Sequence, residues 1–315
     1  MRAISDPLPC GERARLLSVG LKDKLVQSLE YLLDINKSSL SVHFKKARTL
    51  LDEIVSAKKL SGFAFAFNTL LLQATLDEAL DKVIPYFSLL KGRLAVDKIR
   101  QLHYRELAEE AAVNQLFKQY ILFDFPPDTP IQEPAEKDAK QCTRLINEAL
   151  TLIEATDSAS YLEMSEFVSE FMIFEAGVIK AGSSFDLFGL ISFNSVNAKY
   201  SVINAAELLI HETAHLYLYM LGTEDPLVTN DFKEKYYSPL RATERPMLGL
   251  YHAVFVLSRV ICFLKKLIDK PNLSQPDALE AAALIQKYEN IISESLRTIT
   301  SKARLSDLAK ELIAC

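Results

Sequence analysis

The sequence predicts an α+β fold that is predominantly α-helical, with a small β-sheet preceding a helix that carries two histidines. Apolar residues recur at spacings of three and four through most of residues 12–122, which is the period of an amphipathic helix. Two short runs rich in aromatic and β-branched residues, 166–174 and 185–193, are typical of strands, with a turn expected at 181–184. The sheet is therefore expected between a helical first part and a helical last part.

Composition limits the class of protein. In 315 residues, 49% are hydrophobic, enough for a substantial core, and the net charge of -5 argues against a nucleic-acid-binding surface. The four cysteines form no C-x-x-C pair, so neither a disulfide framework nor a zinc ribbon is expected. Charges interrupt every long apolar run, and the first residues lack the apolar core of a signal peptide. We expect a cytoplasmic protein without nucleic-acid or membrane partners.

A change in composition predicts the division into domains. Residues 124–138 contain four prolines and little apolar content, so we interpret them as a connector that cannot hold a helix. Residues 1–123 would form a helical N-terminal region and residues 139–315 a second domain. Within the first region the stretch 62–67 alternates Phe with Ala like a strand, but its continuation favours a helix. Residues 222–245 are expected to lack regular structure and to carry a binding site or a lid.

The motif His211-Glu212-Thr213-Ala214-His215 is the strongest chemical signal in the chain. It lies in a helix expected from Asn204, as N-cap, to Leu221, with Gly222 just past the end. Residues four apart lie on one helix face, so both imidazoles can bind one metal ion while Glu212 projects beside it. The alternative is a pair of packed core histidines. Because the chain has only five histidines in 315 residues, chance rarely produces this motif, and the motif therefore favours a metal site.

A catalytic metal needs a third protein ligand. His252 is the strongest candidate, because it lies in a run from Pro246 that is too apolar to accept an unpaired imidazole. A satisfied core histidine is the alternative. The metzincin pattern fails, because leucines stand at 218 and 221 where it needs Gly and His. A glutamate ligand, as in gluzincins, leaves three candidates by distance alone: Glu224, Glu234 and Glu244.

A series of short motifs after the histidine helix carries a more specific resemblance. A Ser-Pro-x-Arg, an Arg-Pro and a Gly-x-x-His follow one another in that order, at Ser238-Pro239-Leu240-Arg241, Arg245-Pro246 and Gly249-Leu250-Tyr251-His252. Together with the His-Glu-x-x-His helix, this series resembles the HExxH-motif peptide-modification family, over about residues 185–260. Members of that family resemble 2-oxoglutarate- and Fe(II)-dependent peptide β-hydroxylases of ribosomal-peptide natural-product pathways.

The resemblance implies a function and a set of site residues. The chain would be a dioxygenase that hydroxylates a β-carbon of a precursor peptide, with Fe(II) as metal and 2-oxoglutarate as cosubstrate. His211, His215 and His252 would be the iron ligands, and Arg241 and Arg245 would hold the cosubstrate. Three imidazoles suit iron and leave positions for a 2-oxoacid and O₂, while an Arg fork suits a carboxylate. Glu212 would orient a ligand or a bound water.

Two other functions stay open at this point. A zinc metallopeptidase would use Zn(II), with Glu212 as the general base that activates water and either His252 or Glu244 as third ligand. A non-catalytic protein would use the metal only to stabilise a peptide-binding fold. Under either alternative, Arg241 and Arg245 can be surface residues that pair with Glu224, Glu234 or Glu244.

Overall fold

The computed structural model describes residues 6–122, 126, 128–177 and 179–313. Helices hold 65% of the chain and strands 12%, which confirms the predominantly helical α+β class. Contacts divide the chain into two compact units that are interleaved along the sequence. Unit 1 comprises residues 1–14, 145–164 and 200–315, and unit 2 comprises residues 15–144 and 165–199. The connector at 124–138 stays a prediction about domains, and its residues 124, 125 and 127 lie outside the described residues.

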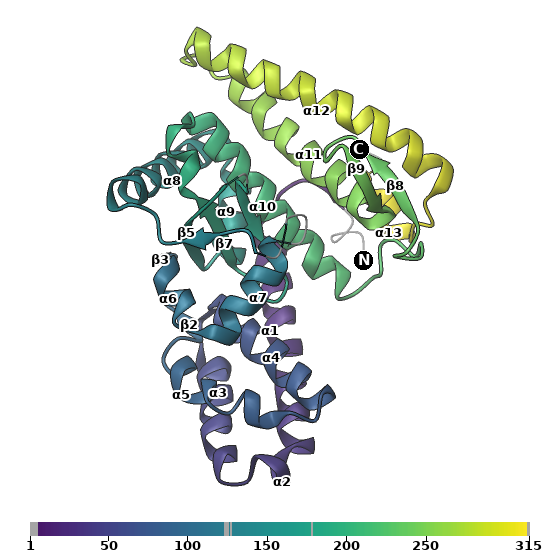
Figure 1. Cartoon of the computed structure of the whole chain (residues 1–315). Helices are drawn as coiled ribbons and strands as arrows, with labels where there is room; N and C mark the ends of the chain where they lie inside the picture. Colours follow the sequence, from purple (N-terminus) through teal and green to yellow (C-terminus); the bar gives the residue numbers. More distant parts are fainter. Residues whose placement is uncertain (1–5, 123–125, 127, 178, 314–315) are drawn as a thin grey trace. The chain divides into compact units, whose positions relative to one another are not determined.

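Three helices contribute residues to both units: α1 (Gly11–Ile35), α8 (Glu136–Thr156) and α9 (Ser158–Phe167). The other helices and strands of unit 2 are shorter than α1 and α8, as Figure 1 shows. Its further helices are α2 (Lys37–Leu40), α3 (Phe44–Ser56), α4 (Gly62–Leu76), α5 (Tyr86–Leu90), α6 (Tyr104–Ala108) and α7 (Ala111–Ile121). Its strands are β1 (Lys59–Leu60), β2 (Ala95–Val96), β3 (Arg100–His103), β4 (Ile131–Gln132), β5 (Glu170–Ala176), β6 (Ala181–Ser183) and β7 (Leu190–Asn194).

The expected sheet precedes the histidine helix in the sequence. Its two expected strands correspond to β5 and β7, which run parallel to each other and are not joined by a simple turn. Strand β5 runs parallel to β3 on one side and to β7 on the other, and β4 pairs with β5. The turn predicted at 181–184 is wrong, because Ala181–Ser183 forms the strand β6, which pairs antiparallel with β7. Gly182 carries no side chain to signal a strand. A Cβ there would lie 2.2 Å from the Tyr120 hydroxyl, so a larger residue at 182 would force the end of the Tyr120 side chain to move.

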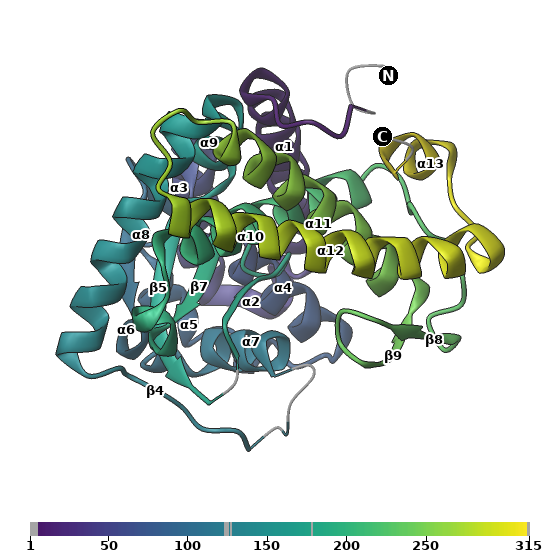
Figure 2. The same cartoon turned by 90° about the horizontal axis from the view of Figure 1, so that it is seen from above.

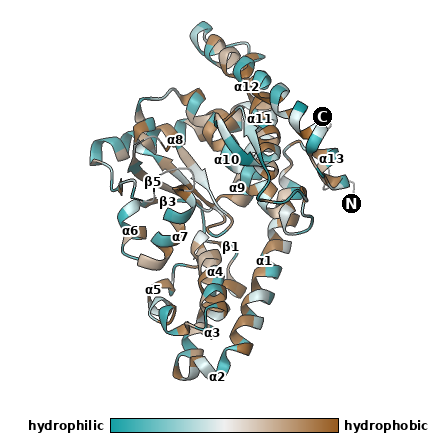
Figure 3. Ribbon diagram, turned by 45° about the vertical axis from the view of Figure 1, so that its right-hand side comes forward, coloured by the Kyte–Doolittle hydropathy of each residue, from teal (hydrophilic) through white to brown (hydrophobic). Residues whose placement is uncertain are grey.

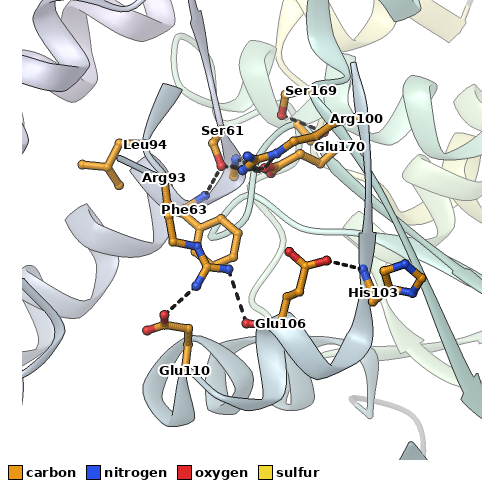
Figure 4. A network of polar contacts seen from close by, with 12 residues as sticks. Ser61, Phe63, Arg93, Leu94, Arg100, His103, Glu106, Glu110, Ser169 and Glu170 are labelled. Atoms are coloured by element: carbon orange, nitrogen blue, oxygen red, sulfur yellow. Dashed lines mark hydrogen bonds and ion pairs between the residues drawn. The ribbon is translucent and has the colours of Figure 1, made fainter. Parts of the chain in front are cut away.

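A buried carboxylate fixes the start of α4, and the helix prediction for 62–67 is confirmed. Glu170 of β5 is fully buried and accepts hydrogen bonds from the Ser61 hydroxyl (2.9 Å) and the Gly62 amide (3.0 Å). The Ser61 hydroxyl in turn accepts from the Phe63 amide as N-cap. Arg100 of β3 donates to Glu170 from Nε (3.0 Å) and Nη2 (2.6 Å), as Figure 4 shows. A helix N-terminus and a guanidinium thus share one carboxylate.

Unit 1 is built around long helices. They are α10 (Val202–Gly222), α11 (Met247–Ile268) and α12 (Gln275–Lys302). The unit also contains the short helix α13 (Asp307–Ile313) and the strand pair β8 (Lys235–Ser238) and β9 (Thr243–Pro246). Helix α11 packs against α10 and α12, and Figure 1 and Figure 2 show α12 running alongside it. The absence of regular structure expected for 222–245 is wrong, because β8 and β9 form an antiparallel hairpin. Polar residues lie on both faces of these short strands, so the sequence does not show the alternation of apolar and polar residues that predicts a strand.

Helix α11 is long and apolar, and much of its ribbon is brown, or hydrophobic, in Figure 3. By length and composition it could cross a membrane, but 72% of its most apolar stretch is buried inside the protein, as in the core helix of a globular domain. Tyr217 of α10 and Phe255 of α11 stack in this core with ring centroids 5.8 Å apart. The buried helix predicted after Pro246 is thus confirmed.

Candidate metal centre

The N-cap of helix α10 lies three residues before the predicted one. The hydroxyl of Ser201 accepts from the Asn204 amide at 3.1 Å, so Ser201 is the N-cap, and Gly222 is the last helical residue rather than the one after the end. Asn204 instead donates its side-chain amide to Ser201 (3.0 Å) and to Glu280, which also accepts from Ser201 (2.7 Å). The cap is therefore reinforced by a carboxylate of α12.

The three predicted metal ligands lie together. His211 and His215 are one turn apart on α10, with ring centroids 5.0 Å apart. His252, on α11, has its ring centroid 5.6 Å from that of His215. The packing of α11 on α10 brings a residue from another helix to the motif face. His215 is the central member, because it contacts both of the other rings.

Two of the three ring separations are close to those of imidazoles that share one ion. With metal–nitrogen bonds of about 2.1 Å, two imidazoles on one ion have ring centroids about 4.5–5.3 Å apart. The separations of 5.0 and 5.6 Å lie within or just beyond that range. Across the part of the chain that the structure describes, no three His, Cys, Asp or Glu side chains are already arranged to hold an ion. Binding at the three histidines thus requires their donor nitrogens to turn toward one point.

The protonation state of the histidines suits a metal. Burial lowers the pKa of His211 to about 4, with the Arg241 cation contributing, and burial lowers the pKa of His252 to about 4. Burial and then the neighbouring histidines and Arg241 hold the pKa of His215 well below its ordinary range. All three imidazoles are thus neutral at pH 7, which is the form that binds metals. Among the described residues, the buried Nδ1 atom of His215 also has no hydrogen-bond partner.

The metal-free protein should lose stability as the pH falls from 6.5 toward 4. Unfolded histidines, with the ordinary pKa of 6.5, take up protons in this range, whereas folded His211 and His252, with pKa values of about 4, do not. The stability is therefore fully present above pH 6.5 and is lost through this window, at about 1.4 kcal/mol for each unit of pKa difference. Urea unfolding of chelator-treated protein at several pH values, followed by circular dichroism, measures how steeply the free energy of unfolding changes with pH. This pH dependence should be weaker in His252→Gln, and an unchanged pH dependence would contradict the prediction.

The predicted arginines lie on the hairpin that connects the two ligand helices. Arg241 follows β8 in the turn, and its charge lowers the pKa of His211 and His215, so it lies near both imidazoles. Arg245 lies on β9, and a Cβ at Gly249 would contact the Arg245 Cβ at 3.6 Å and Nε at 3.8 Å. Since Gly249 and His252 are three residues apart on α11, Arg245 packs on the face that carries His252.

The predicted carboxylates differ in their surroundings. Glu212 is buried, with 6% of its surface exposed, on the turn of α10 between the two motif histidines. Glu244 is exposed on β9, and the alternation of a strand puts it on the face opposite Arg245. Glu234 accepts hydrogen bonds from Tyr236 (2.5 Å) and Arg304 (3.1 Å) on the exposed surface. This arrangement favours His252 over either glutamate as the third ligand.

Three residues of the candidate site were not predicted from the sequence. Glu207 Oε1 lies 3.9 Å from His211 Nδ1 and accepts a hydrogen bond from the Tyr288 hydroxyl of α12 at 2.9 Å. The ring of Tyr219 stacks on His215 at 6.1 Å and contacts His252 at 5.9 Å. Glu207 precedes His211 by four residues and Tyr219 follows His215 by four, so helical spacing was an available signal for both. No spacing rule connects Tyr288 to the motif.

Comparison with known proteins gives no assignment. No protein-family model matches the chain, and no curated protein matches it either.

Proposed function

We propose that this chain is a 2-oxoglutarate- and Fe(II)-dependent dioxygenase that hydroxylates a β-carbon of a residue in a ribosomally made precursor peptide. The observation that carries the proposal is the position of His252, whose ring lies 5.6 Å from that of His215 although 37 residues separate the two in the sequence. A third neutral imidazole beside a His-Glu-x-x-His pair supplies an all-nitrogen ligand set. The motif series that resembles the peptide-modification family contains this same histidine.

Each residue has a role in this proposal. His211, His215 and His252 would hold Fe(II), which with 2-oxoglutarate and O₂ supplies the oxidising power for C–H hydroxylation and yields succinate and CO₂. Arg241 would bind the distal carboxylate of 2-oxoglutarate through two parallel hydrogen bonds, and Arg245, on the His252 face of α11, would assist. The buried Glu212 would accept a hydrogen bond from a bound water and keep it in place.

Cosubstrate binding tests the proposal directly. Anaerobic protein with Fe(II) should develop a visible charge-transfer band when 2-oxoglutarate is added. Arg241→Ala should need about 10- to 100-fold more 2-oxoglutarate for the same band, because a charge-assisted hydrogen bond contributes about 1.5–3 kcal/mol. Arg297→Ala, which removes an exposed arginine of α12, is the matched control and should titrate like the wild type. No band with the wild type, together with tight Zn(II) binding, would overturn the proposal.

A zinc peptidase is the second candidate, and the buried position of Glu212 beside the motif histidines is the observation that keeps it. The Glu212→Gln variant separates the two. A peptidase would lose hydrolysis by several orders of magnitude with its metal retained, because the general base would be missing. A dioxygenase should keep substantial oxidation of 2-oxoglutarate, measured as succinate formed under air. Complete loss of succinate formation with Fe(II) still bound would contradict the role assigned to Glu212.

A further inference from the structure

A carboxylate and a tyrosine lie behind one of the candidate ligands. Glu207 occupies the turn of α10 before His211, on the same helix face, and 6% of its surface is exposed. Its Oε1 atom lies 3.9 Å from His211 Nδ1. Tyr288, buried on α12, donates its hydroxyl to the same oxygen at 2.9 Å. Two helices thus contribute to the surroundings of a single imidazole.

The hydrogen bond from Tyr288 restricts Glu207. A buried glutamate side chain has several rotamers, and a hydrogen bond from a neighbouring helix selects one of them. Burial and the neighbouring Glu207 raise the pKa of Tyr288, so its hydroxyl keeps the proton that it donates. The carboxylate oxygen that faces His211 is therefore held in place by an atom outside α10.

The geometry points to Glu207 and Tyr288 as a positioning pair for His211. At 3.9 Å, His211 Nδ1 and Glu207 Oε1 are too far apart for a hydrogen bond, and the gap must close as His211 turns toward the ion. Glu207 would then accept the Nδ1 proton, so that Nε2 carries the lone pair for the metal, and Tyr288 would fix the carboxylate that does this. A neutral imidazole has one N–H and one lone pair, and the partner of the first decides the position of the second. The inference rests on the proposed function only in requiring that His211 binds a metal ion.

The affinity of the full-length protein for Zn(II) tests this pair. Competition with a chromophoric chelator should show about 10- to 100-fold weaker binding for Glu207→Gln, the usual effect of losing such a partner. Tyr288→Phe, which removes only the hydroxyl, should weaken binding in the same direction by a smaller factor. The double variant should bind no more weakly than Glu207→Gln alone, because Tyr288 acts through Glu207.

A matched control separates positioning from packing. Tyr251, next to His252 on α11, is also buried and donates its hydroxyl to the Ala309 carbonyl oxygen at 3.1 Å. Tyr251→Phe loses a comparable hydrogen bond without touching Glu207 and should bind Zn(II) like the wild type. Because the chain has no tryptophan, circular dichroism is the suitable measure of thermal unfolding for each metal-free variant.

The possible results distinguish this inference from the proposed function. Wild-type Zn(II) affinity in both Glu207→Gln and Tyr288→Phe, even with a lowered melting temperature, would overturn the positioning role and leave the metal site intact. An equal loss of affinity in Tyr251→Phe and Tyr288→Phe would also overturn it, since packing would then explain both. Wild-type affinity in His215→Ala would instead remove the metal site, and the proposed function with it.

Discussion

The His215→Ala variant should lose its metal, with the affinity for Fe(II) or Zn(II) falling by at least about 100-fold, since a lost ligand costs more than a lost partner of a ligand. His215 contacts both other rings, with centroid separations of 5.0 and 5.6 Å, so its removal takes away the neighbour that the other two candidate ligands share. Metal content after gel filtration and the chelator competition both measure the effect. The 2-oxoglutarate band should disappear with the metal.

A second histidine provides the control for this variant. The side chain of His103, on β3, is 53% exposed, and its Nδ1 lies 3.2 Å from a Glu133 carboxylate oxygen. His103→Ala therefore makes the same substitution away from the candidate ligands and should leave metal content unchanged. If His215→Ala retained one equivalent of metal at wild-type affinity, the three-histidine site would be wrong.

The Glu170→Ala variant should be destabilised by about 3 kcal/mol, the lower end of the cost of breaking a buried ion pair. Glu170 is fully buried and satisfies the Ser61 hydroxyl, the Gly62 amide and the Arg100 guanidinium, so its removal leaves these donors without their acceptor. The lower end applies because the Arg100 side chain is 36% exposed and water can solvate part of it. The shift of the urea midpoint measures the loss.

Strand β5 contains its own control for this substitution. Glu175 is partly exposed on the same strand and accepts a hydrogen bond from Gln132 at 2.8 Å. Glu175→Ala should change the stability by less than about 0.5 kcal/mol, as surface substitutions usually do. Similar midpoints for the two variants would show that the shared carboxylate does not hold α4, β3 and β5 together.

Much of the fold was predictable where one periodic signal ran for several turns. Helix α10 and helix α11 followed from their apolar runs, and α4 followed from the continuation of the Phe63 run although burial on all sides blurred its period. The hairpin of β8 and β9 was missed because four-residue strands at the surface carry charged and polar residues on both faces. Strand β6 was missed because it has only three residues, and its glycine packs against Tyr120, which is distant in the sequence.

In the candidate site, contacts within one helix were predictable from the sequence, whereas contacts between helices were not. The pairing of His211 with His215 is a local property of a helix, so the motif predicted it. The meeting of His252 with them depends on the packing of α11 against α10, for which the sequence offered only an imidazole in an apolar run. The contribution of Tyr288 depends on how α12 packs in unit 1, and its polar neighbours in the sequence suggested an ordinary solvated helix.

The register of the small hairpin decides the sign of the charge that faces the His252 helix. Tyr236 pairs with Arg245 and Tyr237 with Glu244, so Arg245 lies toward α11 while Glu244 points away. Because neighbouring residues of a strand face opposite sides, a slip of one residue would exchange the cation for a carboxylate. Under the proposed function, one residue inserted into the turn at 239–242 would therefore place a carboxylate where Arg245 is proposed to assist in binding 2-oxoglutarate, so the length of this turn would decide whether the wall attracts or repels an anion.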